Sequence, residues 1–349
     1  SSDARCMDPQ HRALLSTSMV PAGMLVAEGL GGGCCVTVGF GDKEWGEVLS
    51  SHPPLTGVAP VTSTSGAIAS GRISFFHGMR GPCYALDTAC SSALCALHVA
   101  SRSVFARESA SALSMSVNLY LTPGGHLATE GASMTSADGR CKTLDASANG
   151  YVRSESCTAV AVVSEWSAGS TALLGSSVNQ DGRSSTLTAP NGPSQQQVIA
   201  SSLSSAGVEG SAVCSLQMHG TGTPLGDPIE TGAAGSVLCA GERASPLALE
   251  AVKSSVGHAE WSAGAAGILQ SSMSLRASTY AGVLHLRSMN SYVSASFEAG
   301  PAAKSGVEAA PSGGRARMLH TRAGRRWVAS SAPRTGALAL GKGACDGHE

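Results

Sequence analysis

The stretch that decides the fold reads Cys83-Tyr84-Ala85-Leu86-Asp87-Thr88-Ala89-Cys90-Ser91-Ser92. Its first four residues form a short apolar run that predicts a β-strand, and the residues after it follow a helical pattern at Ala93, Leu94, Leu97, Ala100 and Val104. Cys90 therefore lies at a predicted strand-to-helix turn, where the helix dipole and free N–H groups favour thiolate over thiol. Cys90 is a candidate nucleophile, and the alternative is a structural thiol, since free cysteine is among the most buried residue types.

Two further segments each carry one imidazole in a frame of small residues. His219-Gly220-Thr221-Gly222-Thr223 ends a strand-like stretch from Val213, and its glycines let backbone approach whatever His219 contacts. Lys253-Ser254-Ser255-Val256-Gly257-His258 precedes Ala263-Gly264-Ala265-Ala266-Gly267, a helix start whose small side chains predict close packing. One thiol and two imidazoles are what a carbon–carbon bond-forming acyl transfer needs. The thiol holds one acyl group as a thioester, and the imidazoles handle charge on a second acyl group that loses CO2.

Taken together, these motifs resemble the β-ketoacyl synthase (ketosynthase) family, particularly ketosynthase domains of modular, type I-like polyketide synthases. The resemblance runs from Met7-Asp8-Pro9-Gln10-His11-Arg12 to about His285-Leu286. Between these ends it includes Ser70-Gly71-Arg72-Ile73-Ser74, Gly81-Pro82, Asp138-Gly139-Arg140-Cys141-Lys142, Asp145-Ala146-Ser147, Gly150-Tyr151-Val152-Arg153, Val178-Asn179-Gln180-Asp181-Gly182-Arg183 and Leu187-Thr188-Ala189-Pro190-Asn191-Gly192-Pro193.

The resemblance implies an α/β fold of the thiolase-like type, in which a duplicated α/β half gives five αβαβα layers, usually in a homodimer. The glycine-punctuated alternation of strand and helix patterns agrees with an α/β fold, although no internal repeat is visible in the sequence. We expect an N-terminal ketosynthase half with the nucleophile over residues 1–166 and a C-terminal half with both histidines over 167–290. Residues 291–349 form a divergent, basic tail rich in Ala, Gly and Ser.

The resemblance also implies a decarboxylative Claisen condensation, in which Cys90, His219 and His258 are the catalytic residues. The acyl chain and the malonyl-type extender would arrive on the phosphopantetheine of an acyl carrier protein, with no directly bound metal or redox cofactor. Thr221 and Thr223 match positions that bind the pantetheine, and the alternative is that they only form the turn. Lys253 matches a lysine that supports the polar network of the site, and the alternative is a structural ion pair.

Composition excludes several other classes of protein. The chain of 349 residues has 23 basic and 24 acidic side chains, so no nucleic-acid footprint appears. There is no run of 18 apolar residues, which argues against a membrane span. The first residues show no signal peptide, which predicts an intracellular protein of the cytoplasm or a plastid. The 11 cysteines include no CxxC pair, which argues against a zinc site. Gly29-Leu30-Gly31-Gly32-Gly33 fits no GxGxxG register and is interpreted as a turn before a strand at Cys34–Val38.

Several segments depart from the family pattern. The family's N-terminal strand and helix are missing before Met7 and its glycine-rich C-terminal turn is absent, so we expect a truncated chain with weak condensing activity. Ser154 and Ser156 replace two glycines, which would strain the backbone if either position had positive φ. Residues 301–342 carry eight basic side chains against one acid, as expected of a loosely ordered, solvated tail or a segment that binds an acidic partner. Asp227-Pro228-Ile229-Glu230 is interpreted as a helix N-cap rather than as part of the chemistry.

Three rival functions stay open at this point. A decarboxylase-only or chain-length-factor relative would generally lack the cysteine that this chain keeps at position 90. A degenerate ketosynthase-like scaffold would fold and dimerise without turnover. A thiolase or another Cys/His acyl transferase fits the paired histidine motifs less well.

Overall fold

A computed structural model describes residues 6–41, 44–51, 62–165, 170–186, 189–243, 245–298, 307–308, 327–332 and 336–341. Contacts divide the chain into two compact units, which are interleaved in sequence. The first comprises residues 1–132, 153–165 and 259–265, and the second comprises 133–152, 166–258 and 266–349. Among the described residues, every helix is too short or too polar to cross a membrane.

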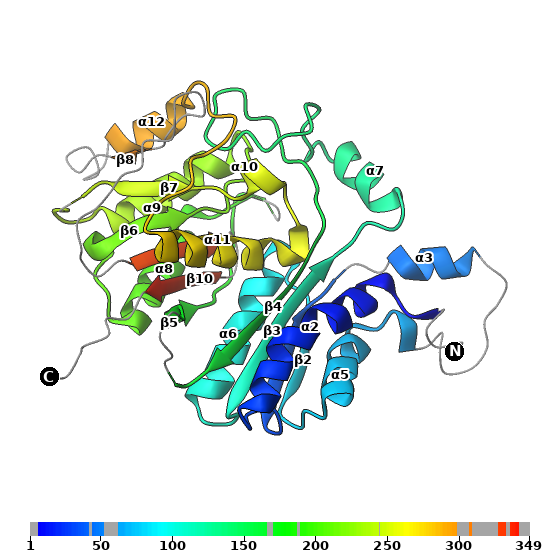
Figure 1. The fold of residues 1–349 in the computed structure, drawn as a ribbon. Coiled ribbons are helices and arrows are strands. Elements are labelled where there is room, and N and C mark those ends of the chain that lie inside the picture. The colour runs from blue at the N-terminus through cyan, green and yellow to red at the C-terminus, as the bar shows by residue number, and fades with distance from the viewer. Residues whose placement is uncertain are drawn as a thin grey trace, which may run out of the picture. The chain divides into compact units, whose positions relative to one another are not determined.

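The first unit is built on a four-stranded sheet (Figure 1). Its strands are β1 (Cys34–Gly39), β2 (Cys83–Leu86), β3 (Ser111–Asn118) and β4 (Ser156–Val163). Their order is β2-β1-β3-β4, with β1 parallel to both β2 and β3 and with β4 antiparallel to β3. Every residue of β1 and β3 is buried, which explains their apolar and small side chains. The predicted strands after the glycine turn and before Cys90 are thereby confirmed.

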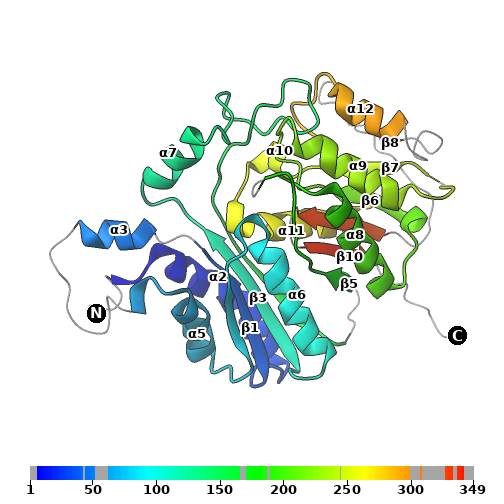
Figure 2. The same cartoon turned by 180° about the vertical axis from the view of Figure 1, so that it is seen from behind.

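Helices cover both faces of this sheet (Figure 2). On one face lie α2 (Pro9–Ala27) and α5 (Gly66–His77), and on the other lies α6 (Ser92–Phe105). The short helices α3 (Glu44–Ser50) and α7 (Gly124–Gly131) complete the unit. The side chain of Asp8 accepts a hydrogen bond from the amide of Gln10 at 2.8 Å and so caps α2, with Pro9 at its first position.

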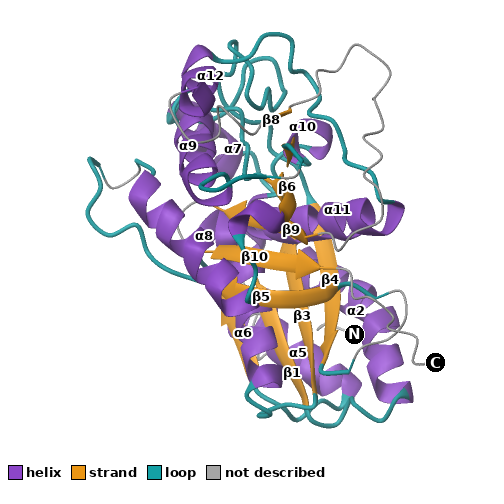
Figure 3. Cartoon of the chain, turned by 90° about the vertical axis from the view of Figure 1, so that its left-hand side faces the viewer, coloured by secondary structure: helices purple, strands orange, loops and turns teal. Residues whose placement is uncertain are grey.

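The second unit is built on a six-stranded sheet (Figure 3). Its strands are β5 (Ala172–Ser177), β6 (Val213–Gln217), β7 (Leu247–Glu250), β8 (Val307–Glu308), β9 (Trp327–Ala332) and β10 (Gly336–Gly341). They follow the order β5-β10-β9-β6-β7-β8. Its helices are α8 (Gly192–Ala206), α9 (Gly226–Leu238), α10 (Lys253–Val256), α12 (Ser291–Glu298) and most of α11 (Ala263–Ala277). Helices α8 and α9 pack on each other, and α8 also packs on β5 and β10.

The two sheets repeat one pairing pattern. In the first, β2, β1 and β3 are parallel neighbours and β4 is antiparallel. In the second, β7, β6 and β9 are parallel neighbours and β10 is antiparallel. Under this correspondence β2 matches β7, so the residues that follow these two strands occupy equivalent places. The duplication that the sequence did not reveal is therefore present in the topology.

The C-terminal region contributes to this second sheet. Strands β9 and β10 form an antiparallel pair, β9 runs beside β6, and β10 runs beside β5. The expectation of a loosely ordered tail is therefore wrong for residues 327–332 and 336–341. The reason is that short strands rich in Ala, Gly and Ser gain their stability from neighbouring strands, which composition cannot show. The eight basic residues of the tail lie outside the described residues.

One buried side chain makes the stability of the first unit depend on pH. The ring of His11, on α2, is 1% exposed, lies 5.5 Å from the ring of Phe40 and has no hydrogen-bond partner among the described residues. Burial, with a smaller contribution from the charge of Arg72, lowers the pKa of His11 from 6.5 to about 4. The folded protein therefore binds fewer protons than the unfolded chain between these values, and its stability falls as the pH drops from 6.5 toward 4.

We predict that His11→Gln removes most of this acid sensitivity. The free energy of unfolding of the wild type should fall by up to about 3 kcal/mol more than that of the variant over this pH interval. Urea unfolding at a series of pH values measures the difference, with the exposed His126→Gln as the control that should follow the wild type. Parallel pH profiles for His11→Gln and the wild type would contradict the assignment.

Candidate active site

Cys90 lies in the first unit, at the turn that joins β2 to α6. A three-residue 3₁₀ turn, η1 (Ala89–Ser91), precedes the first residue of α6, so the predicted strand-to-helix position is confirmed. The thiol is half-buried. We call residues 87–92 the thiol turn. Its backbone is unusual, because Ala89 has φ of 53°, a conformation that non-glycine residues seldom adopt.

The thiol turn is fixed by its own side chains. The hydroxyl of Ser92 accepts from the amide of Thr88 at 2.8 Å and donates to the carbonyl of Ala89 at 2.7 Å. The hydroxyl of Ser91 donates to the carbonyl of Thr88 at 2.7 Å. These short polar residues act as local backbone partners, which is why a strained residue persists directly before Cys90.

His219 lies in the second unit, two residues beyond the end of β6, as the sequence predicted. We call residues 218–223 the imidazole loop. Two of its glycines have positive φ, Gly220 at 48° and Gly222 at 77°. A Cβ on Gly222 would lie 2.7 Å from the amide nitrogen of Lys142, so this position requires glycine for space as well as for conformation. The small residues therefore let the loop pack directly on the backbone near Lys142.

His258 is brought next to His219 in the second unit. It follows α10 and Gly257, it is 1% exposed, and its amide donates to the carbonyl of Val152 at 2.7 Å. The centroids of the His219 and His258 rings are 5.3 Å apart and the ring planes are perpendicular. The ring of Tyr151 packs edge-on against His258 with a centroid separation of 4.9 Å. Two histidines 39 positions apart in the sequence thus form one imidazole pair.

Tyr151 and two buried carboxylates surround the imidazole pair and its loop, although the sequence analysis assigned none of them to the site. Glu230, on α9, accepts from the amides of His219 at 2.6 Å and of Gly220 at 2.9 Å. Asp227 accepts from the amides of Gly222 at 3.1 Å and of Leu144 at 2.8 Å. The sequence signal for this role, accepting hydrogen bonds from the loop amides, was the position of these acidic residues a few places after the glycine-rich segment that contains His219.

The N-cap interpretation of Asp227 is wrong. Helix α9 begins at Gly226, the cap position is Leu225 and no side chain caps it, because the carboxylate of Asp227 is directed to loop amides instead. Burial raises the pKa of Asp227 to about 7, and the charge of Glu230 also raises it, whereas the amide of Leu144 acts in the opposite direction.

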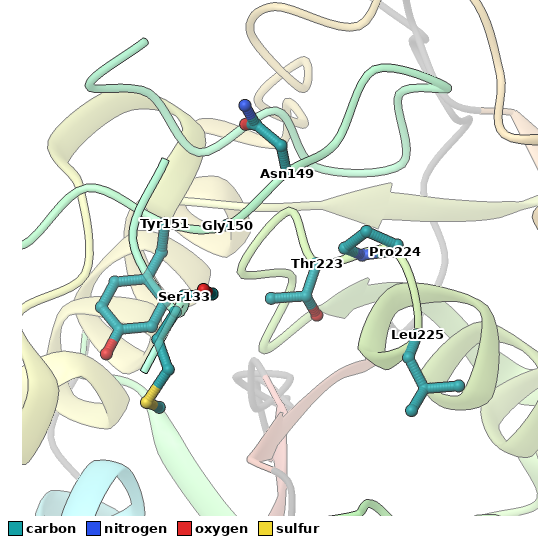
Figure 4. A pocket seen from close by; sticks show the side chains of 8 residues that line it. Ser133, Asn149, Gly150, Tyr151, Thr223, Pro224 and Leu225 are labelled. Carbon is teal, nitrogen blue, oxygen red and sulfur yellow. The ribbon is translucent and has the colours of Figure 1, made fainter. Parts of the chain in front are cut away.

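Figure 4 shows a pocket whose lining includes Tyr151 and Thr223. Its volume is about 360 Å³, and Tyr151, which touches His258, forms one side of it. Thr223 forms another side, and its hydroxyl accepts from the amide of Gly226 at 3.2 Å. The other lining residues are Ser133, Met134, Asn149, Gly150, Pro224 and Leu225. Thr221 is buried, and its hydroxyl lies 3.5 Å from that of Thr223.

Lys253, Ser154 and Ser156 are further residues that the sequence analysis singled out. Lys253 is the first residue of α10 and is 4% exposed, in the same unit as both imidazoles. Ser154 and Ser156 are not among the residues with positive φ, so the strain considered for them does not arise. No group of three or more His, Cys, Asp or Glu side chains that could hold a metal ion occurs among the described residues.

Comparisons with known proteins agree with this arrangement. The model of the β-ketoacyl synthase N-terminal domain matches residues 1–168, and that of the C-terminal domain matches residues 171–287. The chain belongs to the β-ketoacyl synthase family. It is 38% identical over 280 residues to a phenolphthiocerol/phthiocerol polyketide synthase polypeptide of Mycobacterium tuberculosis, covering 77% of this chain and 13% of that protein. It is 39% identical over 303 residues to polyketide synthase GfsA of Streptomyces halstedii, covering 83% of this chain and 4% of that protein.

Solved ketosynthases have the same fold. The ketosynthase from module 6 of the bacillaene synthase of Bacillus subtilis 168 matches with a TM-score of 0.85 and 27% identity, over 99% of this chain and 60% of that one. The oxazolomycin ketosynthase domain OzmH KS7 of Streptomyces albus JA3453 matches with a TM-score of 0.84 and 27% identity, over 99% of this chain and 61% of that one. The thiolase-like fold class is thereby confirmed. The chain spans about 60% of the length of these domains.

We predict that Glu230→Ala destabilises the imidazole loop. The substitution leaves the amides of His219 and Gly220 without their acceptor, and each buried, unsatisfied amide costs about 1–3 kcal/mol. Denaturant unfolding measures the loss, with Glu209→Ala as an exposed control on the same unit that should change stability little. Equal stabilities for the two variants would contradict the anchoring role of Glu230.

Proposed function

We propose that this chain is a condensing domain of polyketide biosynthesis, which joins a Cys90-bound acyl group to a malonyl-type extender by decarboxylative Claisen condensation. The observation that carries the proposal is the perpendicular pair of His219 and His258 beside a pocket. Two adjacent imidazoles can both donate to a single oxygen, which is what an enolate formed by loss of CO2 requires. The reactive thiol at a strand-to-helix turn supplies the second requirement, a place to hold the acyl group.

In the first half-reaction the Cys90 thiolate attacks the carbonyl carbon of an acyl thioester. The bond from the carbonyl carbon to the carrier sulfur breaks, the carrier thiolate leaves, and the acyl group is now bonded to Sγ of Cys90. The position of Cys90 before the first turn of α6 supports this role, because free N–H groups and the helix dipole stabilise a thiolate there. The hydrogen bonds within the thiol turn join the residues on either side of Cys90 and so restrain the backbone that carries it.

In the second half-reaction the malonyl thioester breaks its bond to the carboxylate and releases CO2. The electron pair moves onto the thioester as an enolate, whose oxygen accepts hydrogen bonds from His219 and His258. The enolate carbon then attacks the Cys90-bound carbonyl, the thiolate of Cys90 leaves, and a 3-ketoacyl chain remains on the carrier. Lys253, buried in the same unit, would support the polar surroundings of the two rings.

The pocket beside the pair fits the substrate's arm. The hydroxyl of Thr223, in the pocket wall, can bind an amide of phosphopantetheine, and the hydroxyl of Thr221 lies next to it. The apolar lining of the pocket fits the methylene groups between the amides. The partner would then be an acyl carrier protein, and no directly bound cofactor would be needed. A pantetheine thioester bound outside this pocket in a crystal structure would exclude the assignment.

The proposal extends to a homodimer formed through β2. Among the strands that the structure describes, β2 lies at an edge of the first sheet, and three of its four residues are exposed. On the neighbouring α5, Phe75 is 90% exposed. An exposed strand edge with an apolar side chain beside it can pair with the same edge of a second copy about a two-fold axis. Analytical ultracentrifugation measures the assembly state. If the chain sediments only as a monomer at micromolar concentration, this dimer is excluded.

The nucleophile can be tested directly. Cys90→Ala should abolish acylation by an acyl thioester, because no other described thiol lies at the β2–α6 turn. Peptide mass spectrometry locates the acyl group, with Cys83→Ala as the control for an exposed thiol and Cys95→Ala as the control for a buried one. Both controls should acylate as the wild type does. Acylation that persists in the Cys90→Ala protein would disprove the assignment.

The imidazoles should be separable from the thiol. We expect His219→Ala or His258→Ala to slow malonyl decarboxylation about 10²–10³-fold, the cost of losing one donor to a developing oxyanion. Acylation of Cys90 should fall much less in both variants. Release of labelled CO2 and acyl loading are measured on the same proteins, with the exposed His126→Ala as the control. Equal losses in the two assays would instead indicate that the histidine serves the thiol.

A further inference from the structure

The indole of Trp261 reaches the thiol turn from a distant part of the chain. Its Nε1 donates to Oδ1 of Asp87 at 2.9 Å, and Asp87 is the third residue before Cys90. The same oxygen accepts from the amide of Ala89 at 3.1 Å. The indole packs on Gly41, where any Cβ would overlap the ring. One carboxylate oxygen of Asp87 therefore links the indole to the strained residue that precedes Cys90.

The backbone that carries Trp261 is anchored on both sides. Trp261 is the middle residue of η3 (Glu260–Ser262). The carboxylate of Glu260 forms a two-point ion pair with Arg153, with Nε–Oε1 at 2.9 Å and NH2–Oε2 at 3.1 Å, and both side chains are nearly buried. The hydroxyl of Ser262 lies 2.9 Å from that of Ser116 on β3. Buried bidentate pairs are geometrically specific, so η3 holds Trp261 in one place.

The carboxylate of Asp87 needs such a fixed partner. Asp87 is exposed, and an exposed carboxylate with a single local hydrogen bond samples several rotamers. The indole N–H selects the rotamer that also accepts from Ala89. That amide belongs to the residue with φ of 53°, which keeps its conformation only while its neighbours determine it.

We propose that Trp261 is a positioning residue for the Cys90 thiol, acting through Asp87 to hold the thiol turn in its reactive conformation. The proposal rests on Cys90 being the acyl acceptor of the proposed function. Trp261 needs no contact with the substrate itself. Its effect passes through one hydrogen bond to Asp87 and from there to the amide of Ala89, directly before Cys90.

The test is a double-mutant cycle on the reactivity of the thiol. Trp261→Phe keeps a ring against Gly41 but removes the N–H, and Asp87→Ala removes the acceptor. The rate constant for alkylation of Cys90 by iodoacetamide, read by peptide mass spectrometry, should fall about tenfold in each single variant, the cost expected for one hydrogen bond to a charged group. In the Asp87→Ala background, Trp261→Phe should then change the rate less than about twofold, because both act through one contact.

Trp45→Phe is the matched control. It also removes an indole hydrogen bond in the same unit, from Nε1 to the carbonyl of Cys6 at 2.7 Å, and should leave alkylation of Cys90 unchanged. Asp87→Asn keeps an oxygen that accepts from Trp261 and should restore most of the rate lost in Asp87→Ala. An unchanged alkylation rate of Cys90 in Trp261→Phe would overturn the proposal. So would a loss of rate on Trp261→Phe that is equally large in the wild-type and Asp87→Ala backgrounds.

Two further measurements keep the outcome unambiguous. If Trp261→Phe does not fold, as judged by circular dichroism, the comparison of Asp87→Ala with Asp87→Asn decides, and equal rates in those two would overturn the proposal. Alkylation reports on the thiol without any carrier-bound substrate. The cycle could show coupling between Trp261 and Asp87 while the wild-type protein fails to accept an acyl group. That result would reject the proposed function and leave the positioning role of Trp261 in place.

Discussion

The imidazole loop depends on two buried carboxylates. Glycines give this loop its close approach to neighbouring backbone, but they leave its amides without strand or helix partners, and a buried amide must be paired. Glu230 and Asp227 supply the acceptors from the first turns of α9. These hydrogen bonds fix the backbone that carries His219, whose ring lies beside that of His258.

The duplicated topology explains where Cys90 and His258 lie in the two units. Cys90 follows β2 and His258 follows β7, and these strands hold the same place in the two sheets. Each group is then succeeded by a helix, α6 or α11, whose early residues are small. A Cβ on Gly264 of α11 would lie 2.6 Å from Cγ of Leu94 on α6, which confirms the close packing predicted from the run of Ala and Gly. Equivalent strand ends are therefore followed by Cys90 in one unit and by His258 in the other.

Local patterns were sufficient to predict the strands before Cys90 and His219, because apolar runs and the glycines that bound them depend only on residues close in sequence. The family resemblance predicted the fold class, which the comparisons confirm. The roles of β9 and β10 could not be predicted, since strands of Ala, Ser and Gly are specified by the strands beside them. The partners of Asp227 and the contact between Trp261 and Asp87 were also missed, because 174 positions separate the latter two residues and no periodicity records such a contact.

In the proposed function, His219 and His258 together receive the charge that forms on the extender's thioester oxygen. A crystal structure of this chain with a malonyl-pantetheine analogue that cannot lose CO2 tests it most directly. We expect the carbonyl oxygen of the analogue to lie within hydrogen-bonding distance of a ring nitrogen of each histidine, with the arm of the analogue along the pocket at Thr223 and Tyr151. A carbonyl oxygen bound away from both imidazoles would show that the two histidines do not receive this charge.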